Sequence, residues 1–249
     1  PKNNTTEYVS VFQTAQAKFN WQHSVGFKKP AKEKLFIYEL LLRDFIARHD
    51  FQTLLDALNY LQKLGVNAIE LMPVNEFEGN ESWGYNPAFY FAVDKYYGSK
   101  NAFKSFIDEC HRRGIAVIMD MVLNHSFGQS PMVRMYADGS GRPTANNPWF
   151  NINDKHPYGV GYDFNHETSA TKELVDSVNS FWMDEYKIDG FRFDFTKGFT
   201  NTPGDGWAYD KARINILKRI ADEIWNKNPD ALVILEHFTD NSEETQLAN

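Results

Sequence analysis

Five short apolar segments recur along the chain, each of strand length and almost free of polar interruptions. They begin at Leu35, Val66, Ile115, Gly190 and Ala231. Continuous apolar runs of this length are typical of parallel strands that are buried on both faces. The intervening segments repeat apolar residues at helical spacing, which predicts helices over 51–64, 102–113, 172–186 and 211–227. The chain therefore alternates between predicted strands and predicted helices.

Residues at the ends of the predicted helices support this alternation. Gly65 and Gly114 follow the first two helices, as expected of C-terminal glycines, and Asp50 and Asn101 are expected N-caps. Right-handed strand–helix–strand connections then give an α/β fold, either an open doubly wound sheet or a (β/α) barrel. A glycine-rich phosphate-binding loop does not follow the first predicted strand, which disfavours the dinucleotide-binding version of the open sheet.

The third predicted strand is followed by a long segment, 126–168, that is rich in Gly, Asn, Pro and aromatic residues and lacks helical periodicity. Loops of this length are usually functional, and barrel enzymes build their active sites after the C-terminal ends of their strands. We therefore expect a small inserted subdomain that forms one wall of a cleft. Residues 1–34 are polar and irregular, and we expect them to be a linker from a missing N-terminal β-sandwich module.

A closed barrel needs eight strands, and the sequence pattern contains five. We therefore expect residues 35–249 to form a partial catalytic domain of (β/α)8 TIM-barrel type, with about the first five strand–helix units present. The open edges of an incomplete sheet would favour self-association.

Composition argues against two kinds of partner. The net charge is −7 and basic residues do not cluster, whereas a nucleic-acid surface needs grouped Lys and Arg. The apolar runs fall short of the roughly 20 residues that a membrane-spanning helix requires. Aromatic residues make up 15% of the chain, and flat rings in loops suit stacking against sugars. Cys110 is the single cysteine of the sequence, so an internal disulfide is excluded.

The segment GFRFDF, at 190–195, carries the clearest chemical signal. Its Arg192 and Asp194 are two residues apart and share one face of a strand, while phenylalanines occupy the other face. Asp120 and Glu236 interrupt two further apolar runs near their C-terminal ends. Parallel strands bring such positions to one rim of the sheet. Three acids at one rim favour catalysis over an ordinary buried ion pair.

Spacing between the acids predicts the reaction type. The strands of Asp194 and Glu236 are consecutive and are expected to be neighbours, which suits the carboxyl separation of about 5–5.5 Å found in retaining glycosidases. We predict that Asp194 attacks the anomeric carbon and that Glu236 protonates the leaving oxygen. Arg192 is expected to keep Asp194 ionised, and apolar neighbours are expected to keep the proton on Glu236.

Six segments, in order, resemble motifs of the α-amylase family: GVNAIELMPV, WGYNP, DMVLNH, GYDFN, GFRFDF and ILEHF. The family consists of retaining glycoside hydrolases whose (β/α)8 barrel acts on α-linked glucans. The resemblance implies hydrolysis of starch- or glycogen-type polysaccharides or oligosaccharides through a covalent glycosyl-enzyme, with Asp194 as nucleophile and Glu236 as general acid/base. The first strand, IYELLLRDF, resembles pullulanase-like, isoamylase-like and branching members that carry an N-terminal β-sandwich.

The same resemblance implies roles for other residues. Asp120 would support Arg192, which would orient the nucleophile. His125 would hydrogen-bond the sugar at the cleavage site, and Tyr85 would stack under that sugar. Trp83, in the same loop as Tyr85, is a further candidate for substrate binding.

The resemblance also implies a bound metal ion. The resemblance implies a structural calcium ion (Ca²⁺) with oxygen ligands from Asn124 and Asp163, and it implies no required cofactor. His111, His156 and His166 show no metal-ligand spacing, and we expect them to be surface or loop residues.

Other functions remain open at this stage. An α-glucan transferase of the same family would use the same two acids but pass the glycosyl group to a sugar hydroxyl. A catalytically silent glucan-binding relative is a second alternative, and an open-sheet nucleotide enzyme is a third. The family's third active-site carboxylate, on the seventh strand, is expected beyond Asn249, so residues 1–249 alone are expected to hold a partial site.

Overall fold

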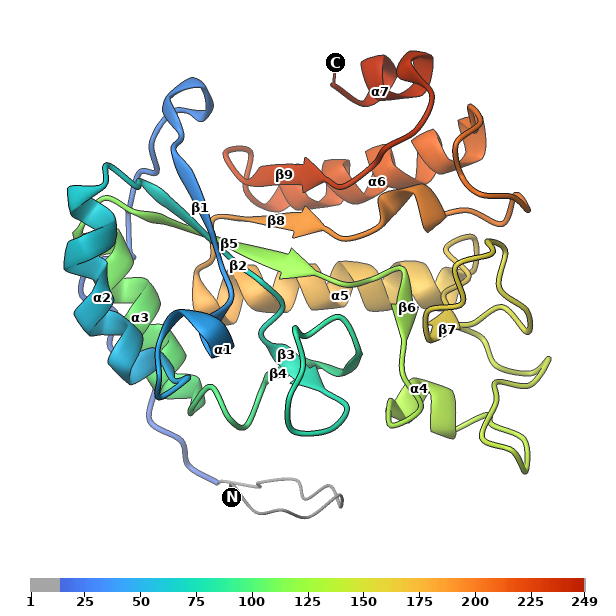
Figure 1. Ribbon diagram of the computed structural model, residues 1–249, viewed down its shortest axis with the longest axis horizontal. Helices are drawn as coiled ribbons and strands as arrows, with labels where there is room; N and C mark the ends of the chain where they lie inside the picture. The colour runs from blue at the N-terminus through green and yellow to red at the C-terminus, as the bar shows by residue number, and fades with distance from the viewer. Residues whose placement is uncertain (1–13, 249) are drawn as a thin grey trace.

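A parallel sheet of five strands lies at the centre of residues 14–248, the part of the chain that the computed structural model describes. The strands stand in the order β1–β2–β5–β8–β9 (Figure 1). Their bounds are β1 Ile37–Leu40, β2 Ala68–Leu71, β5 Ala116–Met121, β8 Gly190–Phe193 and β9 Leu232–Leu235. Each strand is added on the same side of the one before, whereas a doubly wound sheet reverses its order. The predicted α/β fold of barrel type is therefore confirmed.

Helices connect the consecutive strands. Their bounds are α1 Leu42–Phe45, α2 Phe51–Lys63, α3 Lys100–Arg112, α4 Pro131–Arg134, α5 Ser169–Tyr186, α6 Lys211–Lys227 and α7 Asn241–Ala248, with 3-10 turns η1 Lys32–Lys34 and η2 Thr196–Gly198. The longer helices α2, α3, α5 and α6 begin and end within three residues of the predicted ranges. Asp50 caps α2 as predicted, because its side chain accepts a backbone N–H of the first turn.

The prediction that Asn101 caps the next helix is wrong. Ser99 is the cap, since its hydroxyl accepts the N–H of Ala102 at 3.2 Å, and Asn101 lies inside the first turn of α3. Serine and asparagine can both cap a helix, so residue type alone does not decide between positions two residues apart. The predicted C-terminal glycines are confirmed: Gly65 and Gly114 follow α2 and α3 with φ values of +84° and +76°.

The two faces of the sheet differ in what they bury. Side chains alternate between the faces along each strand. One face packs against the helices through the main core, which includes Ile69, Val117, Phe191, Phe103 and Trp182. The other face carries a smaller apolar cluster of Ala68, Ala116, Ile118 and Leu232. Toward the C-terminal strand ends this second face continues with Asp120 and Arg192, which are register partners on β5 and β8.

Two small antiparallel ribbons lie beyond the C-terminal ends of β2 and β5 (Figure 1). In one, β3 (Asn75–Phe77) pairs with β4 (Pro87–Val93), and in the other, β6 (His125–Ser126) pairs with β7 (Tyr162–Asp163). The second ribbon and α4 belong to the segment 126–168, where the sequence predicts an inserted subdomain. The division into 1–34, 35–249 and 126–168 stays a prediction.

Part of the expected linker is docked on the sheet's helical layer. The backbone N–H groups of Gln22, His23 and Ser24 donate to the carboxylate of Asp108 on α3 at 2.9–3.0 Å. The first thirteen residues of that expected linker lie outside the described residues. Within 14–248, every helix is too short or too polar to cross a membrane.

Candidate active site

Arg192 links three acids at the C-terminal edge of the sheet. Its Nη1 lies 3.1 Å from Asp120 Oδ2 and 3.1 Å from Asp194 Oδ1, and its Nη2 lies 3.2 Å from Glu236 Oε1. The side chain of Asp120 is fully buried, those of Arg192 and Asp194 are 14% and 13% exposed, and that of Glu236 is 30% exposed. The structure therefore brings together the four residues on which the sequence argument depends.

Backbone register explains why these four side chains meet. Asp120 and Arg192 are direct partners across the parallel β5–β8 pair, so they stand side by side on one face. The ladder continues past the last strand residues, because the N–H of Asp194 donates to Met121 O at 3.1 Å and the N–H of Glu236 donates to Phe193 O at 3.0 Å. Both acids thus follow directly on the strands that carry them. The separation of their carboxyl groups stays a prediction.

Burial dominates the electrostatics of the two aspartates. It raises the pKa of Asp120 to about 8, against the opposing effect of Arg192. Burial also raises the pKa of Asp194, and the neighbouring Glu236 raises it further, while Arg192 lowers it. Arg192 therefore acts on Asp194 in the predicted direction, although burial has the larger effect, and the ionised state of Asp194 stays a prediction.

Tyr85 and His125 border the acids. The Tyr85 hydroxyl donates to Asp120 Oδ2 at 2.7 Å, and burial raises the pKa of this phenol, which keeps it a donor. Burial lowers the pKa of His125, so its ring is neutral, and its Nε2–H donates to Tyr85 O at 2.8 Å. A hydrogen bond from that nitrogen to a sugar would replace a bond within the protein. Trp83 is 58% exposed, on the loop between β3 and β4.

Glu70 on β2 is an acid that the sequence argument passed over. It shares a face of the sheet with Ile118, its register partner on β5. Burial raises its pKa, and Arg192 opposes that effect, so the guanidinium acts electrostatically on Glu70 as well. The available signal was the acid inside the apolar run VNAIELMPV, which is the same kind of interruption that singled out Asp120.

Asn124 and Asp163, the residues proposed for calcium, do lie in one buried region. Asn124 Oδ1 and Asp163 Oδ1 are buried without a hydrogen-bond partner, which suits a cation in kind. The imidazole of His156 lies close to both, with its Nε2 at 3.3 Å from Asn124 Nδ2 and 3.7 Å from Asp163 Oδ1. Residues 14–248 contain no group of three or more His, Cys, Asp or Glu side chains that could hold a metal. Calcium takes six to eight oxygen ligands, which include amide, backbone carbonyl and water oxygens, so a calcium ion held by Asn124 and Asp163 stays a prediction.

The three histidines expected to be surface or loop residues are all buried; His156 and His166 lie in loops as expected, whereas His111 lies on α3. His111 contacts Asp189 at 3.0 Å, His166 donates from Nε2 to Leu123 O at 2.9 Å, and His156 lies beside the orphaned oxygens just described. Each ring is enclosed by loops or segments that cover the sheet. An isolated histidine in a polar segment does not reveal such tertiary contacts in advance.

The sheet order and the acid-lined C-terminal edge define the class of (β/α)-barrel proteins. Residues 44–157 match the family model described as alpha amylase, catalytic domain. The chain belongs to the α-amylase family, because this family model matches residues 44–157 and a relative at 33% identity matches 88% of the chain.

Two relatives and one solved structure illustrate the similarity. The chain is 33% identical over 223 residues to a malto-oligosyltrehalose trehalohydrolase of Saccharolobus solfataricus, which covers 88% of this chain and 35% of that protein. It is 38% identical over 135 residues to a 1,4-alpha-glucan branching enzyme of Nitrosomonas europaea, covering 54% of this chain and 18% of that protein. The crystal structure of an Anoxybacillus alpha-amylase superposes with a TM-score of 0.69 at 20% identity, over 88% of this chain and 52% of that one. The chain thus spans about a third or less of these two curated relatives.

Proposed function

We propose that the protein hydrolyses α-glucosidic bonds in starch- or glycogen-type glucans with retention of configuration. The observation that carries this proposal is the single guanidinium of Arg192 in contact with Asp120, Asp194 and Glu236. Buried acids joined at the C-terminal edge of a parallel sheet, in a chain of the α-amylase family, support a glycosidase site.

In the proposed reaction Asp194 attacks the anomeric carbon while Glu236 protonates the departing oxygen. Glu236 then removes a proton from the water that hydrolyses the glycosyl-enzyme. The two acids have different roles in this step, because one is needed ionised and the other protonated. Glu236 is the more exposed of the two, which suits exchange of its proton with water.

Neighbouring groups would act on substrate without exchanging protons. Asp120 would hold Arg192 against the nucleophile, and Tyr85, His125 and Trp83 would line the sugar site. The proposed chemistry includes no step through calcium, because an ion held by Asn124 and Asp163 would have a structural role.

Reducing-end assays on soluble starch and on pullulan test the proposal in the full-length protein. We expect new reducing ends from at least one polymer, and we expect Asp194→Asn to abolish them, because an amide cannot form the glycosyl-enzyme. Asp176→Asn is the matched control, an Asp→Asn change at a partly exposed ion pair with Arg219 on the helical layer. If a folded full-length protein released no product from either polymer, hydrolysis would be refuted.

Glucan transfer is the second candidate, favoured by the 38% identity to a branching enzyme. Transfer and hydrolysis share the glycosyl-enzyme and differ in the acceptor. A transferase would change the chain-length distribution of amylose while the number of reducing ends stayed constant. A protein that bound glucan without either change would be a catalytically silent relative.

A further inference from the structure

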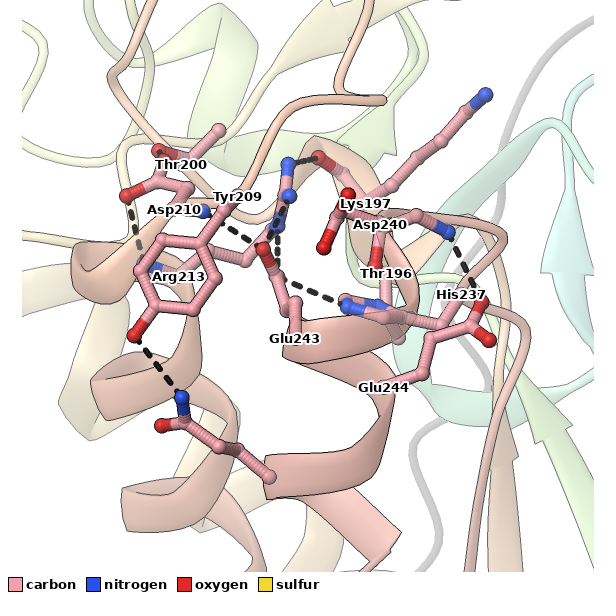
Figure 2. A network of polar contacts seen from close by, with 12 residues as sticks. Thr196, Lys197, Thr200, Tyr209, Asp210, Arg213, His237, Asp240, Glu243 and Glu244 are labelled. Atoms are coloured by element: carbon pink, nitrogen blue, oxygen red, sulfur yellow. Dashed lines mark hydrogen bonds and ion pairs between the residues drawn. The ribbon is translucent and has the colours of Figure 1, made fainter.

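A buried ion pair joins helices α6 and α7 close to Lys197 of the turn η2 (Figure 2). Arg213, near the start of α6, pairs with Glu243 of α7, and their side chains are 1% and 0% exposed. The carboxylate of Glu243 is fully used as an acceptor. It accepts from Arg213 Nε and Nη2 at 2.6 and 2.8 Å, from the N–H of Asp210 at 2.7 Å, and contacts His237 Nε2 at 2.9 Å.

The hydrogen-bond partners of His237 determine which of its ring nitrogens carries the proton. Burial raises the pKa of Glu243, but the hydrogen bonds from Arg213 and the backbone outweigh it, so the net shift is downward and Glu243 is ionised. Burial lowers the pKa of His237, which is therefore neutral and must carry its proton on Nε2, where it faces the carboxylate. The other nitrogen, Nδ1, is then an acceptor, and it lies 2.9 Å from the hydroxyl of Thr196.

Thr196 connects this pair to the proposed general acid. Its backbone N–H donates to Glu236 O at 2.9 Å, and its hydroxyl, which has one proton to donate to either His237 Nδ1 or this oxygen, lies 2.8 Å from the same carbonyl oxygen. The residue before it, Phe195, is held in the left-handed region at φ +48°, and its N–H donates to Glu236 Oε2 at 2.9 Å. The turn η2 thus contacts both the backbone and the carboxyl group of Glu236.

Arg213 also supports this turn directly. Its Nη1 donates to Lys197 O at 2.8 Å, inside η2, and its Nη2 donates to Ala208 O at 3.0 Å (Figure 2). Two separate routes therefore run from the ion pair to η2, one through the ring of His237 and one through the carbonyl of Lys197. A non-glycine residue in the left-handed region persists only where its surroundings enforce it, and these contacts provide that enforcement.

We propose that Arg213, Glu243, His237 and Thr196 are positioning residues for Glu236, which hold η2 so that the Phe195 N–H fixes the carboxyl group at the leaving oxygen. This inference rests on the proposed function. The positioning residues would assist protonation of the leaving group. Their loss should therefore slow cleavage more for a leaving group that needs a proton than for one that does not.

The test compares two substrates in the full-length protein. Maltooligosaccharide needs a proton on its leaving oxygen, whereas α-maltosyl fluoride releases fluoride with little help from an acid. For Thr196→Val, which keeps the shape and removes the hydroxyl, we expect kcat on maltooligosaccharide to fall by about 10-fold or more with KM nearly unchanged, and kcat on the fluoride to fall by much less. For Thr196→Ser, which restores the hydroxyl, we expect the wild-type ratio of the two rates.

Thr171→Val is the matched control, because Thr171 is fully buried and its hydroxyl donates to Trp149 O at 2.9 Å, far along the chain from Glu236. It should leave the ratio unchanged. His237→Gln is a second variant that keeps the contact to Glu243 and loses the one to Thr196, and it should change the ratio in the same direction.

Equal losses on both substrates, or an unchanged ratio in folded Thr196→Val and His237→Gln, would overturn the positioning role. If the wild-type protein cleaved neither substrate, the proposed function would fail first, and this inference with it. The wild-type rates therefore separate the two failures.

Discussion

Replacing Arg192 by methionine would remove the one cation that Asp120, Asp194 and Glu236 share. Methionine keeps much of the length and apolar contact of the side chain. The acids would then repel one another. Asp120 and Asp194 would each bind a proton more readily, because Arg192 lowers the pKa of both aspartates. We expect the variant to be inactive and less stable, with a loss of stability that depends on pH.

The size of the loss follows from burial and linkage. Breaking a buried ion pair by removing one partner costs about 3–5 kcal/mol of folding stability. This range applies to the contacts of Arg192 with Asp120 and Asp194, whereas the contact with the more exposed Glu236 adds little. The folded variant binds more protons than the folded wild type, so its stability falls faster as pH rises, by about 1.4 kcal/mol per pH unit for each extra proton. The loss should be largest near pH 8 and small near pH 5.

Urea unfolding followed by tryptophan fluorescence, at about pH 5 and about pH 8, measures this difference. Arg219→Met is the matched control, because Arg219 pairs with Asp176 at 2.8 Å on a partly exposed surface. That control should cost at most about 1 kcal/mol at either pH. A loss for Arg192→Met that was the same at both pH values, or larger at the lower one, would show that the acids do not gain protons when the guanidinium is removed, and would refute the electrostatic account.

Three further predictions concern stability. Burial raises the pKa of Asp94 to about 7, so up to about 4 kcal/mol of stability is lost as pH rises from about 4 to 7 and the buried carboxyl group ionises. Asp94→Asn removes this ionisation and should therefore raise the melting temperature more at about pH 8 than at about pH 5. An equal change at both pH values would contradict this. A Cβ on Gly190 would lie 2.2 Å from a backbone oxygen of β9, so Gly190→Ala should destabilise by roughly 1–3 kcal/mol or more in urea unfolding, whereas Gly139→Ala, in open space, should not. Adding EGTA should leave the melting temperature unchanged, because residues 14–248 contain no group of three or more His, Cys, Asp or Glu side chains that could hold a metal; a drop that calcium reverses would show a bound ion.

The strands and the central acids could be predicted because local patterns encode them. An acid inside a continuous apolar run marks a strand position that faces away from the helices, and parallel register then aligns Asp120 with Arg192. The competing caps Ser99 and Asn101 show where local chemistry allows two answers. The ion pair of Arg213 and Glu243 could not be predicted, because it joins two helices across thirty residues and neither residue interrupts an apolar pattern.

The environment of Glu236 shows why the unpredicted contacts matter for the predicted chemistry. β9 ends at Leu235, so the acid stands one residue beyond its strand. Its backbone N–H and C=O both bond to the β8 side, to Phe193 and Thr196, and its carboxyl group meets the N–H of Phe195. The position of the acid therefore depends more on the turn after β8 than on β9 itself. Substitutions in that turn should affect leaving-group protonation more than apolar exchanges within β9, although β9 carries the acid in sequence.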